Sequence, residues 1–313
     1  MILGFNILLL LQLLFLLLSS GLGQNGVLRS VNNLVSLRRR RIDNYRFGAG
    51  HICGGALIKI NMVLTAAHCF VDQSKYDGSL LPITDFKVIV GNMFRYVRSN
   101  MSQSFLIAKR FMMQQQFNLS SYEQDIALLL LDSDAPDAYL SDKDMNNSLN
   151  LSLNSRCQLM GWTNRERLND MDQQIILSVQ LLKAKDCMRL SNLTSRHLLP
   201  GLKCAVYQSD NETTSDKCSW DTGTALNCEG RLIGIVSWGS KCSKSLPILY
   251  TDVAYYKDWL NASKTNMSLR FENKQERTSE DKQEKANHQI RIAASIYKII
   301  SLLPIAITYF LLF

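Results

Sequence analysis

Short apolar or alternating segments, separated by turn residues, recur along the chain between residues 47 and 262. The clearest of them span residues 56–58, 86–90, 126–131, 175–182 and 232–238. Runs of this length and period are typical of β-strands, and no long helical periodicity precedes residues 255–260. The pattern therefore predicts one all-β domain of about 230 residues that ends in a short helix.

The first 23 residues carry no charge and include a leucine-rich run over residues 8–18, followed by small residues. This run is typical of a secretory signal peptide, with cleavage after Gly21 or Gly23. It is short for the alternative, an uncleaved membrane anchor. Eight Asn-x-Ser/Thr sequons agree with export, since about three are expected by chance. They begin at Asn100, Asn118, Asn146, Asn150, Asn192, Asn211, Asn261 and Asn266.

A polar segment and a hydrophobic tail follow the main domain, which we place at residues 24–263. Residues 264–291 mix both charges and are predicted to form a solvated linker. Residues 292–313 are mainly apolar, and a tail of this kind after a polar spacer resembles a lipid-anchor attachment signal. A transmembrane helix is the nearest alternative, although Lys298 and Pro304 weaken it. An amphipathic tail that lies on its own domain is the third.

The net charge of +8 is concentrated at the two ends of the chain. Residues 24–46 carry six Arg and one Asp, and residues 264–313 carry eight basic and five acidic side chains. The residues between them, 47–263, carry 21 of each sign. A neutral central domain argues against a basic nucleic-acid cleft. The 46% of hydrophobic residues suffices for a large core, which excludes wholesale disorder.

Three segments carry the residue types that nucleophilic acyl transfer needs. Residues 65–69 read Thr-Ala-Ala-His-Cys, residues 125–129 read Asp-Ile-Ala-Leu-Leu, and residues 216–224 read Asp-Lys-Cys-Ser-Trp-Asp-Thr-Gly-Thr. They resemble the histidine, aspartate and serine boxes of the trypsin/chymotrypsin-like serine proteases, whose serine box reads Gly-Asp-Ser-Gly-Gly. Order and spacing fit from about residue 34 to residue 262, with further matches at Gly161-Trp162 and Ser237-Trp238.

The resemblance implies two packed six-stranded antiparallel β-barrels with the active site between them. The chain also has eight cysteines, an even number that indicates disulfides in an exported protein but by itself allows 105 pairings. The resemblance implies the pairs Cys53–Cys69, Cys157–Cys228, Cys187–Cys204 and Cys218–Cys242.

Two members of the implied catalytic triad are present and the third is replaced. His68 matches the general base, Asp125 the carboxylate that orients it, and Ser237 a serine that hydrogen-bonds this carboxylate. Thr222 occupies the position of the nucleophile. Its β-methyl fixes the rotamer and is predicted to press on His68 or on an incoming carbonyl.

The segment that would bind the oxyanion departs from the family as well. The amides of Trp220 and Thr222 resemble the two donors, but the family has Gly in place of Trp220. Thr224 replaces the second glycine of the box and adds crowding. Removing one such donor typically costs about 10²–10³ in rate. We therefore predict a severe loss of peptidase activity.

The specificity pocket is altered in the same direction. Asp216 matches the carboxylate by which trypsin-like enzymes prefer Arg and Lys, but its neighbour Lys217 is placed to neutralise it. Ile248 and Lys241 replace glycines of the pocket wall and entrance. A branched side chain there leaves little room for an arginine. The alternative is loop variation around an open pocket.

The activation signal of the family, a basic residue before Ile-Val-Gly-Gly, is missing. Arg41 and Ile42 resemble a cleavage site, but only ten residues separate Ile42 from Cys53, too few for the family's first strand. Residues 34–37 match that strand and leave the following arginines on a loop. Asp221, which pairs with the new α-amino group in the family, has no obvious amine partner. Lys217 or another cation is expected to substitute, or the segment stays zymogen-like.

These departures predict an exported, glycosylated serine protease homologue that has lost catalysis and acts by binding a protein, such as a component of a protease cascade. The alternative is a weak trypsin-like endopeptidase that uses Thr222 with His68 and Asp125. A purely structural surface domain is the third hypothesis.

We expect no cofactor and no metal, because residues 72–85, where the family's calcium loop lies, contain no paired glutamates. Four adjacent cations favour an acidic or sulfated ligand, unless the run is a solvated or proteolytically labile loop. These cations are Arg38, Arg39, Arg40 and Arg41.

Overall fold

The computed structural model describes residues 34–72, 74–75, 78–100, 102–112, 121–135, 151–162, 174–191, 199–208, 221–239, 246–265, 287, 289 and 291–292. The predicted signal peptide, most of the linker and most of the hydrophobic tail lie outside these residues. By backbone contacts the chain divides into two units, Met1–Leu260 and Asn261–Phe313. Among the described residues, no helix has both the length and the apolar character that a membrane span requires.

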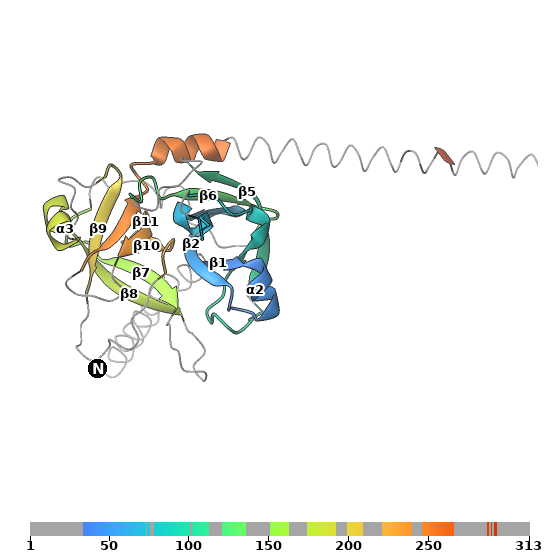
Figure 1. Cartoon of the computed structure of the whole chain (residues 1–313), viewed down its shortest axis with the longest axis horizontal. Coiled ribbons are helices and arrows are strands. Elements are labelled where there is room, and N and C mark those ends of the chain that lie inside the picture. The colour runs from blue at the N-terminus through green and yellow to red at the C-terminus, as the bar shows by residue number, and fades with distance from the viewer. Residues whose placement is uncertain are drawn as a thin grey trace, which may run out of the picture. The chain divides into compact units, whose positions relative to one another are not determined.

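The first six strands close into an antiparallel barrel in the order β1-β2-β3-β6-β5-β4 (Figure 1). Val35 of β1 lies opposite both Gly55 and Val90, so β1 is paired on its two edges. All side chains of β3, β4 and β6 are buried, which explains why these short strands appear in the sequence as mainly apolar runs. The strand bounds are β1 Leu34–Arg39, β2 His51–Lys59, β3 Met62–Thr65, β4 Phe86–Val90, β5 Gln103–Met112 and β6 Ala127–Leu131.

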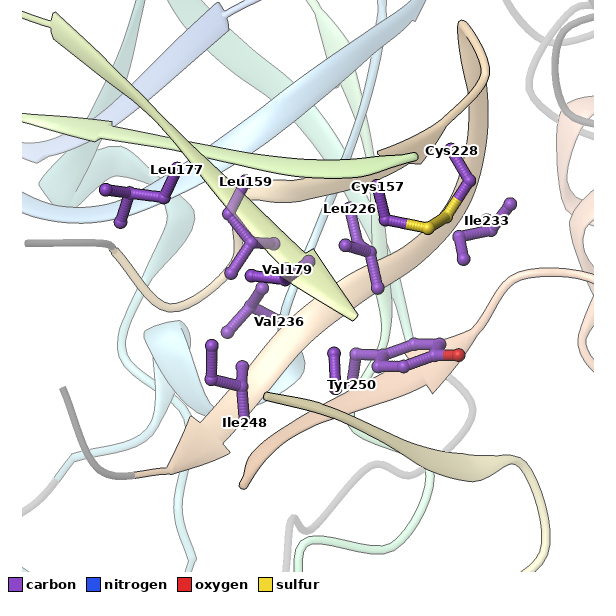
Figure 2. Packing of buried hydrophobic residues seen from close by; sticks show 11 residues of the cluster. Cys157, Leu159, Leu177, Val179, Leu226, Cys228, Ile233, Val236, Ile248 and Tyr250 are labelled. Carbon is purple, nitrogen blue, oxygen red and sulfur yellow. A yellow bond between two sulfur atoms is a disulfide. The ribbon is translucent and has the colours of Figure 1, made fainter. Parts of the chain in front are cut away.

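The other six strands close a second barrel in the order β10-β11-β12-β9-β8-β7. Its core contains Leu159, Val179, Leu226, Val236 and Tyr250, whose side chains lie close together in Figure 2. β8 alternates buried and exposed positions at Leu177–Val179, as a strand with one face on a core does. The strand bounds are β7 Cys157–Trp162, β8 Gln174–Leu181, β9 Leu202–Tyr207, β10 Ala225–Cys228, β11 Arg231–Gly239 and β12 Ile248–Asp252.

The described helices are short, and the first four of them lie between strands. They are α2 Arg40–Tyr45, η1 Ala67–Phe70, η2 Ile83–Asp85 and α3 Ala184–Ser191, and residues 257–265 are also helical. The predicted all-β architecture of two six-stranded barrels with a short C-terminal helix is therefore confirmed. The sequence reading missed α2 and α3, because helices of one or two turns show too little periodicity to be recognised.

The placement of the arginine run on a single loop is wrong. Arg38 and Arg39 belong to β1, where they lie opposite Lys87 and Phe86 of β4. Arg40 and Arg41 begin α2. The strand is longer than its apolar part because Arg38 is itself fully buried, which a hydrophobicity pattern does not anticipate.

Within the described residues, three disulfides connect segments of the two barrels to their neighbours. Cys53–Cys69 joins β2 to η1, and Cys187–Cys204 joins α3 to β9. Cys157–Cys228 joins facing residues of β7 and β10 at the second core (Figure 2). The predicted pair Cys218–Cys242 lies outside the described residues.

Candidate active site

A histidine and a buried aspartate of the first barrel form the centre of the site. His68 lies on η1, which the Cys53–Cys69 disulfide holds against β2. Asp125, fully buried just before β6, accepts the backbone N–H of His68 at 2.9 Å through one carboxylate oxygen. Its other oxygen is 2.8 Å from Nδ1 of the same residue. The second contact fixes the ring and orients Nε2 away from the carboxylate.

The second barrel supplies a hydroxyl on the far side of this histidine. Thr222 Oγ1 lies 3.1 Å from His68 Nε2, within reach of a hydrogen bond. Ser237 of β11 donates its hydroxyl to Asp125 Oδ2, and Thr251 of β12 donates to the Asp125 carbonyl at 2.9 Å. The structure thus brings together the four residues that the sequence placed in the triad and its support. The hydroxyl oxygen of Thr222 is the atom that faces the ring nitrogen of His68.

The turn that carries Thr222 is docked on the first barrel. Gly54 of β2 donates its N–H to the Thr222 carbonyl at 2.8 Å. Gly223 has a φ of 79°, and a Cβ there would come within 2.6 Å of Thr65 Oγ1 and 2.7 Å of the Gly54 carbonyl. Only glycine fits this position. The packing of this turn against the first barrel therefore fixes the position of the threonine hydroxyl opposite His68.

Asp221, the residue before the threonine, has an internal partner. Its Oδ1 lies 3.2 Å from His51 Nε2, and its Oδ2 accepts the Trp162 N–H at 3.2 Å. Burial raises the pKa of Asp221, but His51, the Trp162 amide and the charge of Arg95 together hold it below its ordinary value. The partner that the sequence left open is therefore His51 of β2.

A series of buried polar side chains contacts the Nδ1 side of His51. Ser36 Oγ lies 2.8 Å from His51 Nδ1 and accepts a hydrogen bond from Arg38 Nε at 2.7 Å. Arg38 in turn binds Asp43 Oδ1 through Nη1 at 3.0 Å, and Lys87 Nζ lies 2.7 Å from the other carboxylate oxygen. Ser36, Arg38 and Asp43 are almost completely buried. This series of polar contacts links α2 to Asp221, the residue beside the nucleophile position.

The charges of Asp43, Arg38 and Lys87 compensate one another. Burial alone raises the pKa of Asp43, but Lys87, Arg38 and the Gly48 N–H together lower it below its ordinary value. A buried carboxylate between two cations is compensated rather than isolated, and removing one partner would leave charge uncovered.

Of the predicted specificity residues, only Ile248 lies within the described residues. Ile248 is 1% exposed and belongs to the core of the second barrel, where it lies near Val236 (Figure 2). Asp216, Lys217 and Lys241 lie outside the described residues, as does Trp220.

Tyr122 is a site residue that the sequence reading missed. Its ring centroid lies 5.7 Å from that of His68 and 5.9 Å from that of Trp238. Its φ of 52° is uncommon for a bulky residue. Burial and the charge of Asp125 raise the pKa of its hydroxyl. No sequence signal marks Tyr122, because its place beside His68 depends on this unusual backbone angle.

The described residues offer one group of three candidate metal ligands, Cys53, His68 and Cys69. Both sulfurs are joined in a disulfide, and His68 Nδ1 faces Asp125. These atoms are thus committed to other bonds. Of the predicted sequons, Asn100 and Asn261 are described and exposed, whereas the other six lie outside the described residues.

Two closed β-barrels with a histidine, a buried aspartate and a hydroxyl at their junction define the two-barrel serine protease class. A family profile described as Trypsin matches residues 27–260, and the chain belongs to this family.

Individual relatives agree with this assignment. The tissue-type plasminogen activator of Rattus norvegicus is 30% identical over 245 residues, which cover 72% of this chain and 41% of that protein. Trypsin-3 of Salmo salar is 27% identical over 217 residues, which cover 68% and 83%. The solved structure of neuropsin, a serine protease expressed in the limbic system of mouse brain, matches with a TM-score of 0.56 at 25% identity, covering 75% of this chain and 96% of that one. The chain spans about two fifths of the length of the plasminogen activators that it matches.

Proposed function

We propose that this protein is a non-catalytic member of the trypsin family that acts by binding another protein. The observation that carries the proposal is the pairing of Asp221 with His51. In the family, activation depends on a new α-amino group that pairs with the aspartate of the serine box. Here the imidazole of His51 faces that carboxylate, so the place that the α-amino group would take is already filled.

The pairing bears on catalysis because Asp221 directly precedes Thr222. The direction of the Asp221 side chain helps to set the backbone of the segment from which oxyanion donors must come. A donor that points elsewhere contributes nothing to the transition state. A site held by His51 therefore retains a base and a hydroxyl without an activated oxyanion segment.

Two further features support the same proposal. The hydroxyl at the nucleophile position belongs to a threonine, whose methyl group restricts its rotamers and occupies space beside the path of an incoming carbonyl. Ile248, at a position where the family has glycine in the pocket wall, is fully packed in the second core. An arginine side chain of a substrate would have to displace it.

A weak endopeptidase that uses Thr222 is the second candidate, because Thr222 Oγ1 lies 3.1 Å from His68 Nε2. This distance suits proton transfer from the hydroxyl to the imidazole. The candidate differs from the first only in whether the remaining parts of the site allow turnover.

We also propose export and glycosylation. Three disulfides within the described residues support an oxidising compartment, and exposed Asn100 and Asn261 are accessible for modification. The leader over residues 1–23 and the membrane attachment through residues 292–313 remain predictions from the sequence.

Hydrolysis of Arg- and Lys-containing peptide esters by the purified full chain tests the function. A His68→Ala variant is the matched control, since it removes the base and leaves the fold of η1 in place. We expect both proteins to stay at the same background rate. Turnover by the parent protein that the variant lacks would establish Thr222 as a nucleophile and overturn the proposal.

A further inference from the structure

The Cys53–Cys69 disulfide lies directly beside the imidazole and the hydroxyl at the centre of the site. Cys69 Sγ is 3.8 Å from His68 Nε2, and Cys53 Sγ is 3.5 Å from Thr222 Oγ1. The candidate ligand atoms of Cys53, His68 and Cys69 all lie within 4.8 Å of one another. Two sulfurs, an imidazole nitrogen and a hydroxyl oxygen therefore meet in one small volume at the junction of the barrels.

The spacing of these atoms suits a tetrahedral metal ion. Zn²⁺ binds thiolate sulfur at about 2.3 Å and imidazole nitrogen at about 2.0–2.1 Å, which places a sulfur and a nitrogen ligand about 3.5 Å apart in a tetrahedron. The observed distance of 3.8 Å between Cys69 Sγ and His68 Nε2 is close to that value. Thr222 Oγ1 lies 3.1 Å from the same nitrogen, near the fourth corner, where zinc sites with three protein ligands accept a water.

His68 is oriented as a zinc-binding histidine usually is. Its Nδ1 faces the Asp125 carboxylate at 2.8 Å. A carboxylate in this position fixes the ring and raises the basicity of the nitrogen that binds the metal. Ser237 donates a hydrogen bond to the same carboxylate, so the support extends one residue further. Nε2 is the nitrogen left for a metal, and it is the one that faces Cys69 Sγ.

The redox state of the two cysteines decides whether this site exists. In the oxidised protein their sulfurs are bonded to each other and are not free to bind a metal. A dithiol transfers two electrons and two protons to this bond and leaves as its own disulfide, which creates one thiol on Cys53 and one on Cys69. Zn²⁺ then replaces the two thiol protons, which pass to the solvent.

Other contacts hold the ligand-bearing segments together when the disulfide opens. Thr65, two residues before η1, donates its hydroxyl to the Gly54 carbonyl at 2.7 Å. Gly54 in turn donates its N–H to the Thr222 carbonyl at 2.8 Å. The three ligand residues are buried, whereas Thr222 is partly exposed. A metal ion therefore reaches the ligands from the side of Thr222.

We propose that reduction of the Cys53–Cys69 disulfide by a dithiol creates a zinc-binding site, with Cys53, His68 and Cys69 as ligands and the fourth position beside Thr222. The inference goes beyond the proposed function, because it does not depend on whether the protein turns over a substrate. Zinc occupies the imidazole nitrogen that hydrolysis would need, and it joins β2 to η1 in place of the disulfide.

Titration of the purified full chain with Zn²⁺ and with Co²⁺ tests the site in both redox states. The chain is reduced with dithiothreitol, freed of reductant without air, and compared with the oxidised chain by calorimetry and by the thiolate-to-cobalt charge-transfer band. We expect the reduced chain to bind Zn²⁺ at least about a hundredfold more tightly than the oxidised chain, because two of the three ligands are free only after reduction.

Three variants locate the metal. His68→Ala removes the nitrogen ligand and keeps every thiol, so the reduced variant should bind Zn²⁺ at least about a hundredfold more weakly than the reduced parent. Asp125→Asn removes the carboxylate behind the imidazole and should weaken binding by about 10–100-fold. The matched control, Cys187→Ser with Cys204→Ser, removes two thiols of the second barrel and should bind within about twofold of the parent.

The results separate a built site from binding by an unfolded chain. If the reduced chain loses its circular dichroism signal, Zn²⁺ should restore that signal in the parent and in the control but not in His68→Ala, because binding is then coupled to folding. Equal affinities of the reduced parent and His68→Ala would overturn the inference and assign the binding to unspecific thiols. Failure of Zn²⁺ to bind the reduced parent would overturn it as well. The ester assay uses the oxidised chain, so the two proposals fail independently.

Discussion

His51 Nε2 lies 3.2 Å from Asp221 Oδ1, while the other ring nitrogen of His51 faces Ser36 Oγ at 2.8 Å. Ser36 also accepts a hydrogen bond from Arg38 Nε at 2.7 Å. Nε2, on the other side of the imidazole, faces the Asp221 carboxylate. The Arg38 guanidinium is therefore connected, through a serine and an imidazole, to the residue that precedes Thr222.

Removing the imidazole should destabilise the protein at neutral pH. We expect His51→Ala to lower the free energy of unfolding by about 2 kcal/mol at pH 7, because the Asp221 carboxylate then loses its imidazole partner. Urea unfolding of His51→Ala, Asp221→Asn and the double variant measures the coupling between them. Strictly additive effects would mean that the two side chains do not interact.

The stability should also depend on pH through Asp43. Its pKa is lowered in the folded protein, so the carboxylate stabilises the fold above about pH 4 and this stabilisation is lost as the pH falls through the folded pKa. We expect Asp43→Asn to flatten that part of the stability profile and to be less stable than the parent at pH 7. Thermal melting between pH 2 and 7, as an approximate range around that ordinary value, measures it; a profile parallel to that of the parent would contradict the prediction.

Arg38 and Arg40 should respond differently to the same substitution, although both belong to one arginine run. Arg38→Met removes a buried cation from Asp43 and should cost about 3 kcal/mol, towards the lower end of the range because Lys87 remains. Arg40→Met, at an exposed position, should change stability by less than about 0.5 kcal/mol. Equal losses in chemical denaturation would show that the burial of Arg38 has no energetic weight.

Restoring a serine at the nucleophile position should not restore hydrolysis by itself. Thr222→Ser leaves the Asp221–His51 pair and Ile248 unchanged, so we expect its ester hydrolysis to stay within about twofold of that of Thr222→Ala. A large gain that disappears when His68→Ala is added would identify the threonine as the sole lesion.

Ile248 should behave as a core residue of the second barrel. Its side chain is 1% exposed among apolar neighbours, so Ile248→Ala should cost about 2–5 kcal/mol and Ile248→Val about 0.5–1.5 kcal/mol. Differential scanning calorimetry measures both. A loss below 0.5 kcal/mol, an approximate bound for surface substitutions, for the alanine variant would place the side chain outside the packed core.

Local patterns determined much of the fold and the candidate triad. Strand length and period in segments such as residues 86–90 gave the all-β class, since each strand records in its own residues that it faces a core. His68, Asp125 and Thr222 were recognised because each lies in a short segment with a characteristic order of neighbours. Their convergence followed from the two-barrel family and not from any distance visible in the chain.

The tertiary structure decided which charged and polar side chains pair with one another. Nothing local to Asp221 marks His51, 170 residues earlier by number, as its partner, because the pair exists only where the two barrels meet. Arg38 and Arg40 look alike in the sequence, and their burial differs because β1 continues through Arg39 before α2 begins. Periodicity reports which face of an element is apolar; which charge meets which across a junction depends on chain packing, and that information is not contained in any single segment.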